Sequence, residues 1–267
     1  MSPMTYRHVW SARWADPKVI FDGLSDDYDR YRPRYAMASL ERMLAWTGEV
    51  RALLDLGCGT GILTRALRPL LPAAVIVGAD PGRDMLARAA AATDRALAIG
   101  WLGCRAEALP LAAASLDLVT VGQAAHWFDR AAFYAECARV LRPGGALAIL
   151  YNNRVRRTPV AEAHETLLHR LSPGYTREYR DFDASAELAA LPAARDVTEQ
   201  RLAWDWVRRL DDFIGYVRST SHYKVACRHR PEPEVVAAFA AALAPLADPD
   251  GMLRIPYETV VTLARFG

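Results

Sequence analysis

The feature that most constrains the fold is the stretch Leu-Leu-Asp-Leu-Gly-Cys-Gly-Thr-Gly at 53–61. Apolar residues lead into it, and glycines stand at three alternate positions, Gly57, Gly59 and Gly61. Apolar residues with helical spacing follow at 62–70, so the pattern predicts a strand, a tight turn and a helix. Glycine allows positive φ and close approach of a ligand to the main chain. The first turn of a helix adds unpaired N–H groups, so we expect a nucleotide-like cofactor here.

The spacing of the glycines narrows the choice of cofactor. Dinucleotide-binding folds use G-x-G-x-x-G, whereas this loop reads G-x-G-x-G with an acid, Asp55, two residues ahead of it. The string D-L-G-C-G-T-G resembles motif I of the class I S-adenosylmethionine-dependent methyltransferases. This resemblance implies that the loop, with Asp55, Gly57, Cys58, Gly59 and Gly61, holds the methionine part of S-adenosylmethionine. An ordinary strand–helix turn is the alternative, and an NAD-linked oxidoreductase is the least favoured one.

Length and composition limit the protein to a few classes. The chain has 267 residues, 52% of them hydrophobic, which suits one α/β domain with a small lid. With 33 basic and 31 acidic residues and no basic stripe, we expect no nucleic-acid partner. The N-terminus has no apolar signal core, and no apolar run reaches the ~20 residues that span a membrane.

The cysteines and the other metal-binding side chains give no metal-site pattern. The four cysteines are widely spaced without C-x-x-C, which fits reduced thiols in a cytoplasmic protein, and no metal-ligand spacing is visible. We therefore expect no metal. A small-molecule substrate and a monomer or homodimer complete this expectation.

The N-terminal region carries a second motif, Tyr-Asp-Arg-Tyr-Arg-Pro at 28–33. It is similar to the N-terminal lid of small-molecule methyltransferases of the trans-aconitate type. That resemblance implies that Tyr28 and Arg32 lie near the methionine carboxylate of the cofactor, which a guanidinium could bind through two hydrogen bonds. An arm whose tyrosines, Tyr31 and Tyr35 above all, only pack on the domain is the alternative.

An acid follows the second predicted strand, at 74–79. Asp80 stands 19 residues after Gly61, near the offset at which a carboxylate meets the ribose hydroxyls of a nucleotide. The segment from Asp80 to Leu86 resembles the D-P-x-x-x-M-L motif of the methyltransferases, which implies that Pro81 and Met85 line the adenine. Asp80 could instead serve only as the N-cap of the next helix.

The third predicted strand, at about 99–104, leads to a departure from the family pattern. The family usually has an acid before an Ala-Glu pair, where this chain has Arg105 before Ala106 and Glu107. The adenine would then be held by the backbone N–H of Ala106 and by Glu107 or a water. A solvated turn is the alternative for Glu107.

The fourth predicted strand, at 116–122, ends in Gln-Ala-Ala-His-Trp-Phe-Asp, a string similar to the trans-aconitate group. Ligands of open α/β sheets bind at the carboxyl ends of the strands, so we expect Gln123 and Trp127 to contact the cofactor. A tryptophan ring face attracts a sulfonium. His126 titrates near neutral pH and is the candidate general base. The alternative is that His126 and Trp127 only order the loop.

The remaining pattern predicts helices and strands in an order that the resemblance explains. Expected helices cover 36–47, 130–141, 159–171, 185–191, 210–219 and 233–246, and expected strands cover 146–151, 197–207 and 254–265. The resemblance implies an α/β fold with a doubly wound, mostly parallel seven-stranded sheet of order 3-2-1-4-5-7-6 and an antiparallel last strand. It divides the chain into an N-terminal lid segment at 1–50, a Rossmann-like core at 51–151, and lid helices with the last two strands at 152–267. The helices at about 8–46, 157–193 and 210–246 would form the lid.

Three arginines, Arg154, Arg156 and Arg157, follow the fifth predicted strand. They could neutralise an anionic substrate, but we favour a solvated turn.

The resemblance implies transfer of a methyl group from S-adenosylmethionine to a small molecule by in-line displacement, releasing S-adenosylhomocysteine. A carboxylate acceptor needs no base, whereas a hydroxyl or an activated carbon could use His126. One alternative is an enzyme of the same fold that binds S-adenosylmethionine but catalyses a dehydration or cyclisation. Another is a non-enzymatic cofactor sensor.

Overall fold

The computed structural model describes residues 23–175 and 182–267. The part of the expected lid segment that precedes Gly23 therefore lies outside the described residues. The chain forms two compact units. The first comprises the chain up to Pro33 with Asn153–Asp181 and Ala203–Glu258, and the second comprises Arg34–Asn152, Phe182–Leu202 and Thr259–Gly267.

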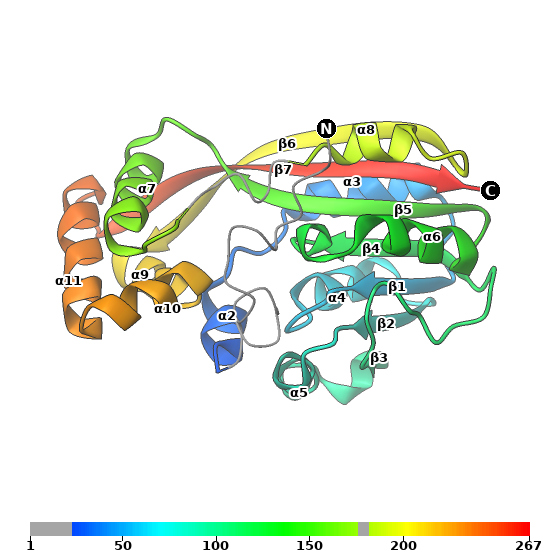
Figure 1. The fold of residues 1–267 in the computed structure, drawn as a ribbon, viewed down its shortest axis with the longest axis horizontal. Coiled ribbons are helices and arrows are strands. Elements are labelled where there is room, and N and C mark those ends of the chain that lie inside the picture. The colour runs from blue at the N-terminus through cyan, green and yellow to red at the C-terminus, as the bar shows by residue number, and fades with distance from the viewer. Residues whose placement is uncertain (1–22, 176–181) are drawn as a thin grey trace. The chain divides into compact units, whose positions relative to one another are not determined.

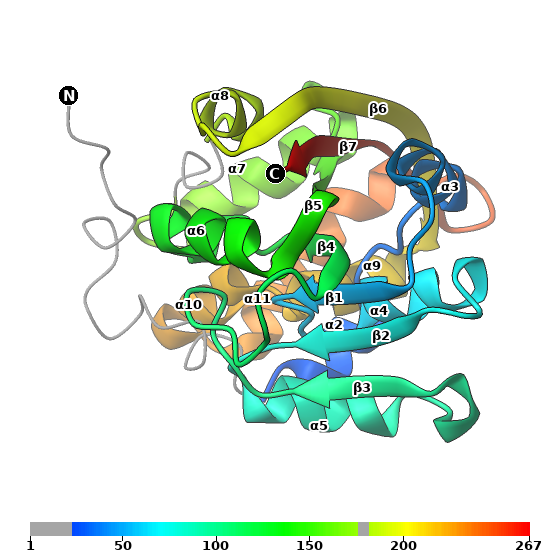
Figure 2. The same cartoon turned by 90° about the vertical axis from the view of Figure 1, so that its right-hand side faces the viewer.

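One seven-stranded sheet organises the described residues, and its order β3-β2-β1-β4-β5-β7-β6 is the predicted one. The strands are β1 Ala52–Leu56, β2 Val75–Ala79, β3 Ile99–Leu102, β4 Leu116–Gly122, β5 Leu141–Arg154, β6 Ala194–Arg209 and β7 Met252–Phe266. Figure 2 shows them one above another in this order. The first five strands pair in parallel, and the antiparallel pairing expected at the end of the sheet is confirmed.

The fifth strand is longer than the expected 146–151. It begins at Leu141, directly after helix α6, Arg130–Val140, and Leu141 already pairs with Leu116. The register then shifts between Leu116 and Leu118, which absorbs the Arg-Pro-Gly-Gly segment as an irregularity within the strand. Proline and glycine therefore end the helix as predicted, but they do not delay the strand.

Alternation along the strands builds two apolar layers in the second unit. Leu53 and Leu118 point into a layer with helices α3, Met37–Thr47, and α4, Ile62–Leu67. Their neighbours Leu54 and Val119 point into the opposite layer with α6. Successive side chains of a strand face opposite sides of the sheet, so a central strand covered on both faces is apolar throughout.

Two helices expected in the lid lie in this second unit. Helix α3 buries Leu40 and Met43 in one layer, and α8, Ala184–Ala189, buries Ala184 and Leu188 in the other. Their apolar faces are covered there, which is why they belong to the sheet unit. Helix α5, Arg83–Ala91, follows β2 and contacts β3 (Figure 1).

The first unit is mainly helical, with the outer ends of the last strands. Its helices are α2 Ser25–Tyr31, α7 Pro159–Leu171, α9 Leu210–Arg218, α10 Ser221–His229 and α11 Glu232–Leu243. Their apolar faces share a core around Phe213 and Phe239. The sequence did not predict α10, whose N-cap Thr220 accepts a hydrogen bond from the backbone of Tyr223. Across the ranges that the structure describes, no helix is both long and apolar enough to cross a membrane.

Candidate active site

Asp55 lies at the centre of the sheet and fixes the shape of the glycine loop. The Thr64 hydroxyl of α4 donates to its Oδ2 at 2.6 Å, and the Thr120 hydroxyl of β4 donates to its Oδ1 at 2.8 Å. The side chain has no exposed surface. Burial raises the pKa of Asp55 to about 6, although these hydrogen bonds oppose the rise. These contacts give Asp55 a positioning role, in which it joins β1, β4 and α4, and its predicted contact with the cofactor stays a prediction.

The glycine loop takes the conformation that its sequence predicts. Gly57, Gly59 and Gly61 all have positive φ, at 63°, 54° and 79°. A Cβ on Gly57 would lie 2.5 Å from the Cβ of Ala124, and one on Gly61 would lie 2.5 Å from the Trp101 ring. Close packing thus requires glycine at the first and third positions.

Gly59 differs from Gly57 and Gly61, because none of the residues that the structure describes comes within 4 Å of the place where its Cβ would be. Its positive φ is therefore combined with open space, which is the arrangement expected where a ligand approaches the main chain. Cys58 stands between the glycines, and its backbone N–H donates to the Ala79 carbonyl at 3.0 Å. Burial, with Asp55 and Asp80 nearby, holds the pKa of the Cys58 thiol well above its ordinary value.

Asp80 connects the glycine loop to the loop after β2. Its Oδ2 accepts from the Gly59 N–H at 3.0 Å, and its Oδ1 accepts from the Gly82 N–H at 2.7 Å. Asp80 is not the N-cap of α5, because Gly82 holds that position without a side-chain cap hydrogen bond. The Asp80 carboxylate instead connects Gly82 to the open part of the glycine loop. The side chain is half-buried, and each oxygen can accept a second hydrogen bond.

The residues expected around the adenine lie on the loops after β2 and β3. Met85 and Ala106 are buried, while Pro81 is half-buried. Glu107 accepts from the Asp129 N–H at 2.9 Å through Oε1 and pairs with Arg105 through Oε2 at 3.3 Å. Both oxygens of Glu107 therefore have partners in the protein, and the residue is not the solvated turn of the alternative.

Gln123 ends β4 in an unusual conformation. Its φ is +59°, which is uncommon for a residue other than glycine. Its Nε2 donates to the Asn152 carbonyl at 3.1 Å, whereas its Oε1 is buried without a hydrogen-bond partner in residues 23–175 and 182–267. Strained backbone and unsatisfied buried polar atoms occur together at ligand sites, so this amide is suited to receive a donor from a ligand.

His126 follows on a short helical turn, Ala125–Trp127, and forms a pair with Tyr151 of β5. Its Nδ1 lies 3.0 Å from the Tyr151 Oη, and its backbone N–H donates to the same oxygen at 3.2 Å. The His126 and Trp127 rings lie 4.9 Å apart, and His126 is only 6% exposed. The sequence analysis missed Tyr151, although its place at the end of a parallel strand was the available signal.

The hydrogen bond to Tyr151 determines what His126 can do chemically. When Nδ1 carries the proton and donates to Oη, Nε2 keeps its lone pair and can accept a proton from a substrate. When the Tyr151 hydroxyl donates to Nδ1, Nε2 carries the proton and is a donor. The direction of the hydrogen bond between His126 and Tyr151 therefore decides whether Nε2 of His126 is a proton acceptor or a hydrogen-bond donor.

Tyr28 and Arg32 belong to the first unit and are in contact with each other. The Arg32 guanidinium lies 4.4 Å from the centre of the Tyr28 ring. Its Nε donates to the Ser219 hydroxyl at 3.0 Å and its Nη2 to the Ser219 carbonyl at 2.9 Å. Their predicted proximity to the methionine carboxylate stays a prediction.

Comparison with known proteins agrees with the fold and the loop. A family model described as a methyltransferase domain matches residues 54–149, the segment with the glycine loop, Asp80 and His126. An uncharacterized methyltransferase of Mycobacterium tuberculosis H37Rv is 33% identical over 262 residues, covering 93% of this chain and 96% of the relative.

Solved structures share the architecture. One from Anaeromyxobacter dehalogenans, provisionally named a type II methyltransferase, has a TM-score of 0.64 at 26% identity, covering 88% of this chain and 98% of that one. An N-methyltransferase from Haemonchus contortus, in complex with phosphomonomethylethanolamine and S-adenosylhomocysteine, has a TM-score of 0.55 at 15% identity, covering 95% of this chain and 59% of that one. The chain therefore belongs to the class I S-adenosylmethionine-dependent methyltransferases.

Proposed function

We propose that this protein transfers the methyl group of S-adenosylmethionine to a small-molecule acceptor and belongs to the trans-aconitate type of the family. The observation that carries the proposal is the open space at Gly59, in a loop whose other two glycines are closely packed. The Asp80 carboxylate adjoins that space through the Gly59 N–H. A carboxylate and a buried amide oxygen on Gln123 suit a polar nucleoside with an amino-acid end.

The bound S-adenosylmethionine would supply a carbon already activated by the sulfonium, so the protein has to align and desolvate the reactants. In this proposal Gly57, Cys58 and Gly61 shape the loop around the methionine part, and Asp80 accepts from the ribose hydroxyls. Pro81, Met85, Ala106 and Glu107 surround the adenine. Gln123 and Trp127 face the sulfonium side, and Tyr28 and Arg32 bind the methionine carboxylate.

His126 takes the role of general base when the acceptor is a hydroxyl or an acidic carbon. The Nδ1 contact with Tyr151 holds the ring in place and lets Nε2 accept the proton. An acceptor carboxylate, being ionised already, needs no proton transfer. The same site therefore serves acceptors of both kinds, and the base matters for only one of them.

The decisive experiment substitutes Gly59 by alanine and uses Gly144→Ala as a matched control. Both glycines have positive φ, at 54° and 82°, and neither has an atom of the described residues within 4 Å of its missing Cβ. Each substitution should therefore cost about 1–2 kcal/mol of stability through backbone strain alone. Gly144 lies in the irregular start of β5, at the end opposite Tyr151.

We expect S-adenosylhomocysteine at a hundred times its dissociation constant to stabilise the wild-type chain by about 2.7 kcal/mol. Gly144→Ala should keep this stabilisation, and Gly59→Ala should lose most of it. Formation of S-adenosylhomocysteine with a panel of small acids and phenols, with a product heavier by one methyl group, then separates transfer from a non-methylating reaction. Equal binding by the two variants would mean that the cofactor does not use this loop.

A further inference from the structure

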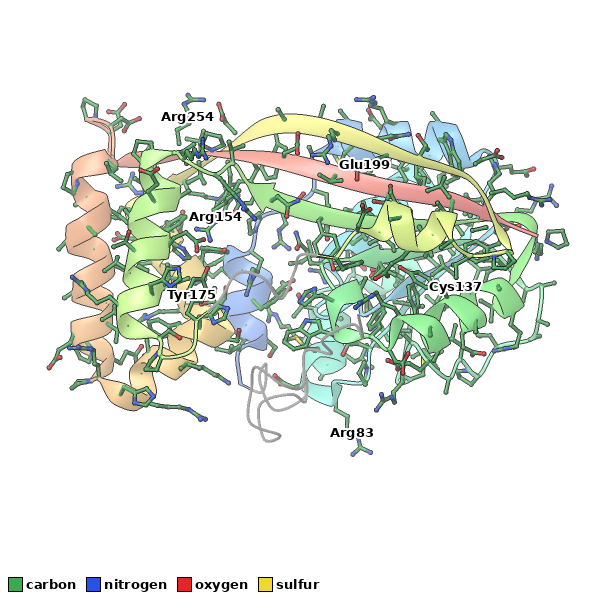
Figure 3. The ribbon with its side chains drawn as sticks, turned by 45° about the horizontal axis from the view of Figure 1, so that its top comes forward. Arg83, Cys137, Arg154, Tyr175, Glu199 and Arg254 are labelled. Atoms are coloured by element: carbon green, nitrogen blue, oxygen red, sulfur yellow. The ribbon has the colours of Figure 1, made fainter. Side chains whose placement is uncertain are left out.

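Arg154, the last residue of β5, is a buried cation in the first unit (Figure 3). Its side chain is 10% exposed, and its Nη1 is buried without a hydrogen-bond partner among the described residues. Arg156 and Arg157, two and three residues further on, are exposed. The preference for a solvated turn is therefore wrong for Arg154, because its side chain turns into the protein.

Among the described residues, the positive charge of Arg154 has only a distant ion-pair partner, Glu165. Glu165 of α7 approaches with its Oε1 3.6 Å from Nη2, which is longer than the ~2.7–2.9 Å of a charge-assisted hydrogen bond. The other oxygen of Glu165 accepts from the Tyr175 hydroxyl. Glu165 is therefore shared between two partners.

Two further neighbours of Arg154 are the tyrosines Tyr216 and Tyr257. The Tyr216 ring lies 5.7 Å from its guanidinium carbon. Tyr257 of β7 is buried, and burial raises the pKa of its hydroxyl, so this phenol stays neutral. Burial alone would lower the pKa of Arg154, but Tyr216, Tyr257 and Glu165 raise it above its ordinary value.

A second guanidinium adds to the positive charge in this unit. Arg32 lies 5.4 Å from the centre of the Tyr216 ring. Two arginines that are distant in the sequence, Arg32 and Arg154, therefore both lie within 6 Å of that ring. A buried charge without a close partner is costly, and it persists where a ligand supplies the partner. The planar fork of arginine fits an oxyanion through two parallel hydrogen bonds.

We propose that Arg154 binds an oxyanion, in first place a carboxylate, within the first unit. The ligand would be an acidic small molecule whose carboxylate is held by Nη1 in an aromatic setting, and the assignment stands apart from the cofactor loop of the second unit. Tyr216 positions the guanidinium from one side, and Glu165 holds Nη2 so that Nη1 points to the ligand. Phosphate esters share this chemistry, and the test separates them from carboxylates.

The test uses the whole 267-residue chain and three probes that share a phenyl ring: benzoate, phenyl phosphate and the uncharged benzamide. Binding is measured by calorimetry with S-adenosylhomocysteine present and absent. Arg154→Gln removes the cation and keeps part of the side-chain volume. Arg157→Gln is the matched control, since it removes an exposed cation three residues away, and Arg154→Lys keeps the charge without the fork.

We expect benzoate to bind the wild-type chain and Arg157→Gln equally, and Arg154→Gln at least tenfold more weakly. Benzamide should bind none of them measurably, and Arg154→Lys should fall between wild type and Arg154→Gln. Tighter binding of phenyl phosphate than of benzoate would overturn the carboxylate assignment. Equal affinity of benzoate for wild type and Arg154→Gln, or no binding to wild type, would overturn the oxyanion site.

Binding of S-adenosylhomocysteine separates this proposal from the methyl-transfer function. Arg154→Gln should bind S-adenosylhomocysteine within twofold of wild type, which also shows that the variant is folded. If Arg154→Gln does not fold, the same comparison is made with Arg154→Lys. A chain that binds benzoate through Arg154 but does not bind S-adenosylhomocysteine would refute the proposed function while keeping the anion site.

Discussion

Replacing Asp55 by asparagine should change how the stability of the protein depends on pH. The carboxylate is fully buried, and its pKa in the folded protein is about 6, against 3.8 for the unfolded chain. The folded state therefore binds the proton more tightly than the unfolded state does. Stability from this group is fully present below the unfolded pKa of 3.8 and is lost as the pH rises through 6.

The size of this effect follows from the difference between the two pKa values. A difference of about two pKa units, at 1.36 kcal/mol each, corresponds to about 3 kcal/mol. Since other carboxylates also titrate between pH 4 and 7, the useful quantity is the difference in unfolding free energy between wild type and Asp55→Asn. Because part of this change already occurs below pH 4, wild type should lose about 2.4 kcal/mol relative to Asp55→Asn between pH 4 and pH 7.

The measurement is urea unfolding of both proteins at half-unit steps from pH 4 to pH 7.5, followed by tryptophan fluorescence. Thr120→Val serves as the control, because it removes one hydrogen bond to the ionised carboxylate and should move the midpoint of the change to higher pH. A free-energy difference that stays constant across this range would refute the raised pKa.

Two further predictions concern the side chains of His126 and Glu136. His126→Ala should lower methyl transfer to a hydroxyl acceptor at least a hundredfold and leave transfer to a carboxylate acceptor within about threefold, as measured by S-adenosylhomocysteine release. An unchanged rate with the hydroxyl acceptor would exclude the base. Glu136 has a pKa of about 2, lowered chiefly by its hydrogen bond with Arg139, so its stabilisation is present above pH 4.5 and lost as the pH falls towards 2. Glu136→Gln should therefore be less stable than wild type at pH 7, by up to about 1 kcal/mol in urea unfolding. This difference in unfolding free energy should shrink as the pH is lowered. A difference that is as large at pH 2.5 as at pH 7 would contradict the lowered pKa.

Local patterns were sufficient to predict most of the sheet. The strand at 116–122 and the helix at 159–171 have the predicted bounds, because apolar periodicity and turn residues are encoded within each segment. The early start of β5 was missed, since it depends on the pairing of Leu141 with Leu116 in another strand. Helix α10 was missed as well, because its polar sequence has little apolar content and is stabilised by burial of residues such as Tyr223 and Ala226 in the first unit.

For the site, as for the fold, the sequence predicts features that lie within one segment but not the contacts between distant segments. Positive φ at the three glycines could be predicted, because no other residue adopts that conformation as easily. The Tyr151 contact of His126 and the burial of Arg154 could not, since each depends on which way a side chain turns at the end of β5. Alternation places successive residues on opposite faces, but it does not say which end residue enters the protein.

Hydrogen-bond capacity gives a physical criterion for separating ligand contacts from positioning residues. Asp55 accepts a hydroxyl hydrogen bond on each oxygen and has no exposed surface, which favours a positioning role. Among the described residues, Gln123 and Arg154 each keep one buried polar atom without a hydrogen-bond partner, at a cost that a ligand would offset. A carboxylate acceptor would need no general base, so we expect His126 to matter only for an acceptor whose reacting group is a hydroxyl or an acidic carbon.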